Sequence, residues 1–291
     1  MLPDSIKEFI QLNKSFEGEP IKIENCFNLS GGCINDAALI KTNIGEFFIK
    51  WNIEKKYPAM LEKEAKSLEF LAKYNLIDVP EVIFFDYVSE YQFLVLQYIK
   101  SGIKVKNFWE DFAVKLANIH MQKNKYFGFE FDNYIGSLSQ SNNYKDNWSD
   151  FFIEERLVPM IKMARDSNKI SSVLVNKFNN FFKKIDEIFP DEQPSLLHGD
   201  LWNGNFMVNE NGYVCFIDPA VYFGFREMDI AMSKLFGGFD SKFYETYNEY
   251  YQMEKGWEVR LDYCNLYPLL VHVNLFGGGY INSVERVLSK F

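Results

Sequence analysis

The sequence predicts an α+β fold with two lobes, a small one built on an antiparallel sheet and a larger, mainly helical one. Short strand-like runs separated by turns occupy the first third of the chain, and runs with helical periodicity fill most of the rest. The 291 residues, 47% of them apolar, are enough for a large core. We place the small lobe at 1–99 and the large lobe at 100–291, because the turn-like Lys100-Ser101-Gly102 follows an apolar strand.

Charge and composition exclude several classes of partner. The net charge is −9 and no block of Lys and Arg occurs, so we expect no nucleic-acid partner. The first residues lack the pattern of a signal peptide, and no apolar run approaches the ~20 residues of a membrane helix, so we expect no membrane partner and a cytoplasmic location. The cysteines form no C-x-x-C pair, which favours reduced thiols over a zinc site.

The small lobe begins with a predicted helix over 4–14 and continues as an antiparallel meander. Residues 21–24 alternate as in a strand, and further strands are predicted over 37–40 and 46–51. The segment 28–33 is the first corner of this meander. It carries Gly31, Gly32 and Cys33.

The glycine corner has two interpretations. Glycines let backbone N–H groups approach phosphate oxygens, so Gly31, Gly32 and Cys33 are candidate nucleotide-binding residues. An ordinary hairpin turn is the alternative. If the Cys33 thiol is accessible, its oxidation could impair ATP binding, or link two copies of the chain into a redox-dependent dimer. A small residue tolerated in a turn explains Cys33 equally well.

Lys50 ends an apolar run where a nucleotide-binding lysine would reach phosphates, unless it is only a solvated lysine at a strand end. A helix is predicted over 58–74. Glu64 lies one turn before Leu68, near the apolar side of that helix, where it could hold the Lys50 ammonium. Glu62 is the competing candidate.

Strands at 82–85 and 93–99 complete the small lobe. The second is a continuous apolar run, which indicates burial on both faces. A hinge at its end would offer the backbone groups of Gln97, Tyr98 and Ile99 to an adenine ring.

The large lobe is predicted to be mostly helical. We expect a helix over 107–122 in which His120 is a structural histidine with satisfied hydrogen bonds. A turn-rich connection over 124–147 could line a substrate site or be a plain surface loop. The remaining predicted helices cover residues 148–166, 171–188, 226–235, 241–251, 260–276 and 280–288.

The most informative stretch runs from His198 to Asn205 and is followed, past an apolar strand, by Asp218. Asp200 and Asn205 are separated by four residues, and Asp218 lies thirteen residues beyond Asn205. A carboxylate, a carboxamide and a second carboxylate at these intervals are what a magnesium–ATP phosphotransferase requires. D-x-x-x-x-N alone is common, but its combination with the apolar lead-in and the strand ending in Asp218 is specific.

Each of these groups has a predicted role. Asp200 would accept the hydrogen bond of the attacking hydroxyl, so it is the candidate catalytic residue. Asn205 and Asp218 would supply oxygen ligands to Mg²⁺. We expect His198 and Asp229 to brace the loop. The P-loop pattern G-x-x-x-x-G-K-[ST] is absent, which disfavours a Walker-type NTPase.

The chain resembles the fructosamine kinase (ketosamine-3-kinase) family, in the aminoglycoside/choline kinase branch of the protein-kinase-like fold. The tryptophan that follows Asp-Leu in the stretch above is the distinguishing mark. Further segments extend the resemblance over nearly the whole chain: Leu29–Asn35, Phe48–Lys50, Glu64-Ala65, Phe127-Gly128, Asp132–Gly136, Gln140, Asn143, Trp148, Asp218–Ala220, Tyr222–Gly224, Arg226–Met232, Leu235–Phe239, Leu266–Leu270, His272 and Asn274–Tyr280.

The resemblance implies ATP-dependent phosphorylation of the sugar 3-hydroxyl of a fructosamine or related ketosamine, small or protein-bound, in deglycation. It also implies that Asp200 is catalytic, that Asn205 and Asp218 hold Mg²⁺ and that Lys50 with Glu64 anchors ATP. Two other functions stay open: a small-molecule kinase of the aminoglycoside/choline type, and a catalytically silent nucleotide-binding regulator. The joint presence of all these residues argues against silence.

Trp202 has two interpretations, and two other positions depart from the family pattern. Trp202 could stack on a sugar ring, or it could pack within the loop. Gln97 stands where the family often has glutamate, which changes a side-chain contact but spares the backbone donors. Phe225 replaces a residue that is commonly polar, which puts the shape of its loop in doubt.

Overall fold

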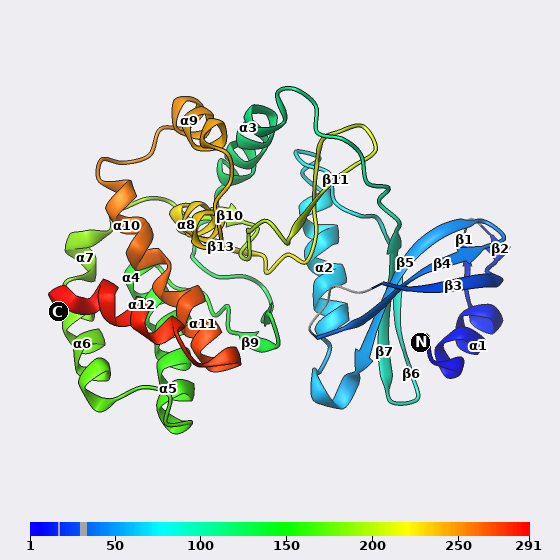
Figure 1. The fold of residues 1–291 in the computed structure, drawn as a ribbon, viewed down its shortest axis with the longest axis horizontal. Coiled ribbons are helices and arrows are strands. Elements are labelled where there is room, and N and C mark those ends of the chain that lie inside the picture. The colour runs from blue at the N-terminus through cyan, green and yellow to red at the C-terminus, as the bar shows by residue number, and fades with distance from the viewer. Residues whose placement is uncertain (17, 30–33) are drawn as a thin grey trace. The chain divides into compact units, whose positions relative to one another are not determined.

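The computed structural model describes residues 1–16, 18–29 and 34–291 (Figure 1). The contacts between these residues group them into two compact units. The first unit comprises Met1–Phe108 and Met207–Asp218, and the second comprises Trp109–Phe206 and Pro219–Phe291. The first unit contains an antiparallel sheet with helices, and the second unit is mainly helical. The fold is therefore of the predicted α+β class.

The first unit is built on a five-stranded sheet with the order β3-β4-β5-β7-β6, and all neighbours are antiparallel. The predicted meander is confirmed, and β7 has a strand on each side and a run of buried residues. That strand ends at Gln97, two residues earlier than predicted. The strands are β3 (Ile23–Leu29), β4 (Asp36–Thr42), β5 (Gly45–Ile53), β6 (Val82–Val88) and β7 (Tyr91–Gln97).

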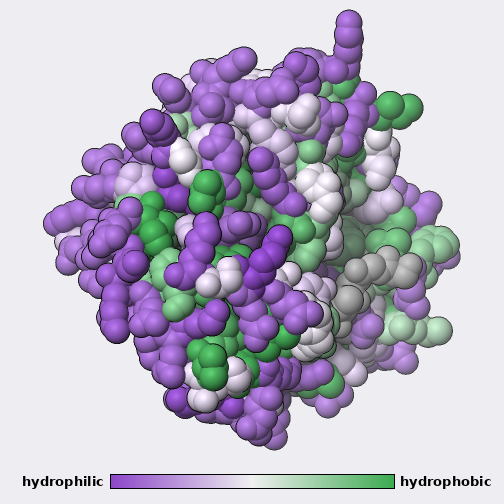
Figure 2. Space-filling view, turned by 60° about the vertical axis from the view of Figure 1, so that its left-hand side comes forward, coloured by the Kyte–Doolittle hydropathy of each residue, from purple (hydrophilic) through white to green (hydrophobic). Residues whose placement is uncertain are grey.

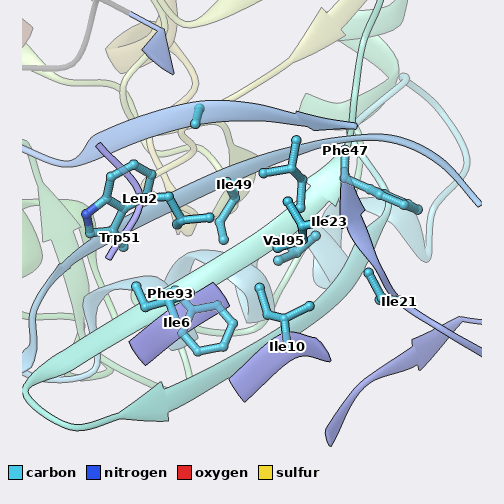
Figure 3. Packing of buried hydrophobic residues seen from close by; sticks show 12 residues of the cluster. Leu2, Ile6, Ile10, Ile21, Ile23, Phe47, Ile49, Trp51, Phe93 and Val95 are labelled. Atoms are coloured by element: carbon cyan, nitrogen blue, oxygen red, sulfur yellow. The ribbon is translucent and has the colours of Figure 1, made fainter. Parts of the chain in front are cut away.

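One face of the sheet is covered by the first helix, α1 (Asp4–Asn13). Its Ile6 and Ile10 are fully buried and point towards the sheet (Figure 3). Ile49 and Phe93 of neighbouring strands belong to the same apolar cluster. Because successive strand residues face opposite sides, this packing determines which residues face the other side.

The other face packs against α2 (Met60–Ala72). Its Leu61, Ala65 and Leu68 recur at helical spacing and are buried against Leu94 and Leu96 of β7. With Ile49 and Trp51 on the α1 side, the alternation of β5 turns the intervening Lys50 towards α2. The position of this lysine therefore follows from the strand period.

The first unit also includes residues 100–108 and most of a later hairpin, β11 (Phe206–Val208) and β12 (Val214–Phe216). Gly102 N donates to Val208 O at 3.0 Å, and Val105 N donates to Gly212 O at 3.2 Å. These bonds explain why the contact boundary falls after Phe108; a functional boundary after residue 99 stays a proposal. The remaining elements of the unit are β1 (Ser15–Phe16), β2 (Glu19–Pro20) and a 3₁₀ turn at Glu54–Lys56.

The second unit is mainly helical, as expected, but three predicted helices are interrupted. The helices are α3 (Phe108–His120), α4 (Trp148–Phe151), α5 (Val158–Asp166), α6 (Ser172–Phe182), α7 (Ile185–Ile188), α8 (Glu227–Leu235), α9 (Ser241–Tyr250), α10 (Trp257–Cys264), α11 (Leu266–Phe276) and α12 (Tyr280–Val287), and a 3₁₀ turn, Leu288–Lys290, follows. Pro268 lacks the N–H that would bond to Cys264 O, consistent with the break at Asn265 between α10 and α11.

The predicted helix over 148–166 contains a π-helical segment, Phe152–Leu157, between α4 and α5. Pro159 cannot donate to the carbonyl of Glu155 four residues earlier, and that carbonyl accepts from Arg156 Nη1 at 3.1 Å. The wider turn places Arg156 in the core, where it is fully buried.

Part of the predicted connection over 124–147 is a small hairpin, β8 (Asn133–Ile135) and β9 (Leu138–Gln140). A second antiparallel pair joins β10 (Ser195–Leu197) to β13 (Tyr222–Gly224). The strand β10 leads directly into His198.

Hydrophilic residues dominate the face shown in Figure 2, with small apolar areas between them. Among the helices of the described residues, none combines the length and apolarity needed to cross a membrane.

Candidate active site

Lys50, Glu64 and Asp218 form a charged group in the first unit. The Lys50 ammonium pairs with the Glu64 carboxylate and lies 2.5 Å from Asp218 Oδ1. Glu62, the competing glutamate, instead pairs with Lys66 at 2.6 Å and accepts from the Tyr87 hydroxyl. The preference for Glu64 is confirmed, because it lies on the side of α2 that packs on the sheet.

Burial and charge set the protonation of this group. Burial lowers the pKa of Lys50, but the carboxylates of Asp218 and Glu64 outweigh it and raise the pKa above its ordinary value. Burial raises the pKa of Glu64 to about 7, which the ammonium only partly offsets. The lysine is thus held as a cation beside an exposed carboxylate, Asp218.

Asp218 has an unusual backbone. Its φ of 51° lies in the left-handed region, which a residue with a side chain adopts at a cost and which clusters at functional sites. The following Pro219 has no N–H, so the next backbone donor is that of Ala220.

The hinge residues line a cavity of about 300 Å³ in the first unit. Gln97 N donates to Glu81 O at 2.9 Å, so this N–H is already used. Among the described backbone hydrogen bonds none involves Tyr98 or Ile99. The lining is Asp78, Val79, Gln97, Tyr98, Ile99, Lys100, Asn209, Glu210, Asn211 and Cys215, without Lys50.

The loop after β10 is held by side chains of the second unit. Asp229 accepts from His198 N at 2.8 Å and from Gly199 N at 2.9 Å. Asp200 N donates to His198 Nδ1 at 3.2 Å, so the predicted bracing by His198 and Asp229 is confirmed. Gly199 has φ 85°, and a Cβ there would lie 2.0 Å from Ala220 O, so only glycine fits.

Asp200 and Asn205 are joined by hydrogen bonds. Asn205 Nδ2 donates to Asp200 O at 2.8 Å and to Asp200 Oδ2 at 2.9 Å. The carboxylate is half-buried and the carboxamide buried. This arrangement fixes one oxygen of the candidate base.

The residues present suit a hard cation such as Mg²⁺. With Asn205 Nδ2 donating to Asp200, no hydrogen bond to Asn205 Oδ1 is found within the described part of the chain, so this oxygen can serve as a ligand. The exposed carboxylate of Asp218 is a second oxygen donor of the kind Mg²⁺ prefers. Among the described residues there is no cluster of three or more His, Cys, Asp or Glu that could hold a metal ion.

The Trp202 side chain packs within its loop and is also partly exposed, as stacking on a sugar ring would require. Its side chain is 36% exposed, and its ring meets Phe236 edge-on at 6.0 Å. The ring also lies against Gly204, where a Cβ would come within 2.4 Å of it. The ring is therefore fixed by the loop and still presents a surface.

His120 is the structural histidine that was expected. Its Nδ1 lies 2.7 Å from the Tyr247 hydroxyl and its Nε2 lies 3.2 Å from Asp229 Oδ2. Burial lowers its pKa below the ordinary value.

The structure groups the candidates by unit. Lys50, Glu64 and Asp218 come together in the first unit, whereas Asp200 and Asn205 come together in the second. Gly31, Gly32 and Cys33 lie outside the described residues, so their nucleotide-binding role and the thiol hypothesis stay predictions.

Sequence reasoning missed a set of buried amides in the second unit. Asn133, Gln140 and Asn142 are each 1–2% exposed. The polar composition of 124–147 predicted a loop, because burial of a polar side chain cannot be read from its type alone. Their strand-like spacing on either side of Gly136 was the available signal.

The fold defines the class first: the chain has the protein-kinase-like fold. Its structure matches that of an amicoumacin kinase in complex with AMP-PNP, with a TM-score of 0.63 at 12% identity, covering 100% of this chain and 93% of that one. At this identity the match shows the fold alone.

The family follows from closer matches. The family model described as fructosamine kinase matches residues 5–291, and the chain belongs to that family. It is 35% identical to the chloroplastic protein-ribulosamine 3-kinase of Arabidopsis thaliana over 100% of this chain and 88% of the relative. A crystal structure from Haemophilus somnus 129PT that carries a fructosamine-3-kinase name matches with a TM-score of 0.86 and 28% identity, over 99% of this chain and 96% of that one. The chain is thus a phosphotransferase of the kinase type.

Proposed function

We propose that this enzyme uses magnesium and ATP to phosphorylate the sugar 3-hydroxyl of ketosamines, with Asp200 as the catalytic base. The observation that carries the proposal is the bonded pair Asp200–Asn205 in a chain of the fructosamine kinase family. The relative in Arabidopsis is named for ribulosamine bound to protein, which supports a ketosamine acceptor here.

Asp200 is suited to accept a proton from a hydroxyl. The hydrogen bond from Asn205 Nδ2 holds one carboxylate oxygen. The backbone N–H of Asp200 is held by His198, which limits movement of the loop. A fixed, charged carboxylate orients the attacking hydroxyl and takes its proton late in the transfer.

The remaining groups would bind the nucleotide and the ion. Asn205 Oδ1 and the carboxylate of Asp218 would hold Mg²⁺, which neutralises phosphate charge when bound. The Lys50 ammonium, held by Glu64, would contact phosphate oxygens. The backbone groups of Tyr98 and Ile99 would face the adenine.

The test is an ATP-consumption assay against fructosyl-lysine, ribulosyl-lysine, an aminoglycoside and choline. Turnover is expected with a ketosamine and should require Asp200. Turnover only with the aminoglycoside or choline would show the alternative small-molecule kinase. ATP binding without turnover of any acceptor would show the silent regulator.

Two narrower expectations belong to this proposal. A cytoplasmic location and small or protein-bound ketosamines as partners fit the reaction, although the plant relative is named as chloroplastic. A redox-linked dimer through Cys33 is tested by comparing the mass of the oxidised and reduced protein with that of Cys33→Ala.

A further inference from the structure

Three buried amide side chains of the second unit satisfy one another. Asn133 and Gln140 are cross-strand partners in the β8–β9 hairpin. Gln140 Nε2 donates to Asn133 Oδ1 at 2.8 Å, and Asn142 Nδ2 donates to the same oxygen at 3.1 Å. Burying a polar group costs free energy unless the group is hydrogen-bonded. The other hydrogen bonds of these three side chains, here called the amide cluster, therefore show which parts of the chain the cluster holds in place.

Two of the three amides, Asn133 and Gln140, also donate to the backbone just after Asp218. Asn133 Nδ2 donates to Val221 O at 2.8 Å, and Gln140 Nε2 lies 3.3 Å from Ala220 O. These are the second and third residues after Asp218.

The same backbone is held from a second direction. Ala220 N donates to His198 O at 2.8 Å, in the loop that carries the candidate base. Ala220 is therefore bonded through its N–H by the loop and through its carbonyl by Gln140. The peptide groups on both sides of Ala220 have little freedom to rotate.

The amide cluster is itself fixed from behind. The Tyr267 hydroxyl donates to Gln140 Oε1 at 2.8 Å, which orients the amide so that Nε2 points at Ala220. Arg156 Nη2 donates to Asn142 Oδ1 at 2.7 Å, and its guanidinium lies 4.1 Å above the Tyr222 ring. A buried cation and a buried tyrosine thus set the direction of the amides.

We propose that Gln140 and Asn133 are positioning residues for Asp218, and that Tyr267 acts through Gln140. By holding the carbonyls of Ala220 and Val221, they keep Asp218 in the left-handed conformation that sets the direction of its carboxylate. Strained conformations persist where surrounding bonds determine them, and the amide cluster supplies those bonds. The inference rests on the proposed function only in taking Asp218 as a magnesium ligand.

The test is the affinity for AMP-PNP with and without Mg²⁺, measured by calorimetry in the absence of acceptor. Tyr267→Phe removes one hydroxyl without changing the packing, and Gln140→Leu removes the amide. Tyr267→Phe should reduce the gain in affinity that Mg²⁺ provides by about fivefold to tenfold, the effect of losing one hydrogen bond. Gln140→Leu removes three hydrogen bonds and should reduce the gain further. The affinity without Mg²⁺ should stay that of the wild type.

Tyr263→Phe is the matched control. Tyr263 is a buried tyrosine of the same unit whose ring packs on Phe181 and Phe291. This variant should keep the full gain from Mg²⁺. Thermal unfolding of every variant shows whether it is folded.

Two results would overturn the inference. One is a folded Tyr267→Phe with the wild-type gain from Mg²⁺. The other is an equal loss of affinity with and without the ion, which would mean that the amide cluster only supports the fold. Wild-type binding that ignores Mg²⁺ would contradict both this inference and the role of Asp218. A wild type that binds magnesium and AMP-PNP as expected but turns over no ketosamine would contradict the proposed function alone.

Discussion

At the level of single residues, two glutamates on the same helix allow a substitution to be compared with its own control. Glu64 and Glu62 differ by two positions in α2, yet only Glu64 lies on the side facing the sheet and pairs with Lys50. Glu62 bonds outward to Lys66 and Tyr87.

Glu64→Gln is expected to raise the KM for ATP by about tenfold, because the buried ammonium loses a charged partner. Glu62→Gln should leave this KM unchanged. Steady-state kinetics at saturating acceptor measures both. Equal effects of the two substitutions would mean that Glu64 does not position Lys50.

Trp202→Ala is expected to raise the KM for the ketosamine and leave the KM for ATP unchanged, because the exposed part of the ring can stack on a sugar. The Asp200–Asn205 bonds do not involve the indole, so kcat at saturating acceptor should fall less than kcat/KM. An unchanged acceptor KM and kcat would show that Trp202 only packs within the loop. Gly204, which lies under the ring, must stay glycine for this test.

At the scale of elements, the start of α8 holds the loop after β10 through Asp229. His120 of α3 and Tyr247 of α9 complete this hydrogen-bonded group. Arg226 and Lys123 also act on the ring and, with burial, oppose its protonation, whereas Asp229 favours it.

These contacts predict a pH dependence of stability. The folded-state pKa of His120 lies below 6.5, whereas an unfolded chain keeps a value of about 6.5. Below that pH the unfolded chain binds more protons at this residue, so the contribution of His120 to the free energy of unfolding should fall as the pH falls. Urea unfolding of the wild type and of His120→Gln between about pH 5 and about pH 8 measures this contribution as the difference between the two slopes, and the slope of the free energy of unfolding against pH should be more positive in the wild type. His272, whose pKa burial also lowers, contributes a slope of the same sign in both proteins, whereas Glu64, whose pKa burial raises to about 7, contributes a slope of the opposite sign in both. An identical slope in the variant would contradict this assignment.

The spacing of apolar residues predicted the helices and strands in which that spacing runs without interruption. The apolar positions of α2 were enough to orient Glu64, whereas the burial of Lys50, which the sequence left open, follows from the alternation of β5 in the structure. The breaks at Asn265 and in the π-helical segment were missed, because apolar spacing continues across them. A proline within a periodic run was the signal in both cases.

At the scale of the whole molecule, sequence spacing predicted the residue types of the site but not their supports. Asp200, Asn205 and Asp218 carry chemistry that their spacing reveals. Gln140 and Asn133 hold the backbone after Asp218 by hydrogen bonds to Ala220 and Val221, which lie 80 and 88 positions away in the sequence. No local pattern contains that pairing.

Chelation should separate catalysis from folding. Asn205 Nδ2 donates to Asp200, and the Asp218 carboxylate pairs with Lys50, so both side chains are held by contacts within the protein. EDTA should therefore abolish turnover while leaving the melting temperature of the nucleotide-free protein unchanged. A large fall in that temperature would indicate a structural metal instead.

Asp200 is the proposed base for phosphoryl transfer to a ketosamine. The most direct measurement is the rate of phosphate transfer from ATP to ribulosyl-lysine and fructosyl-lysine, with the phosphorylated position determined by NMR. The wild type should phosphorylate the 3-hydroxyl, and Asp200→Asn should lower kcat by about 10²–10⁴-fold with little change in ATP affinity. No turnover of either ketosamine, or full activity of Asp200→Asn, would contradict the account.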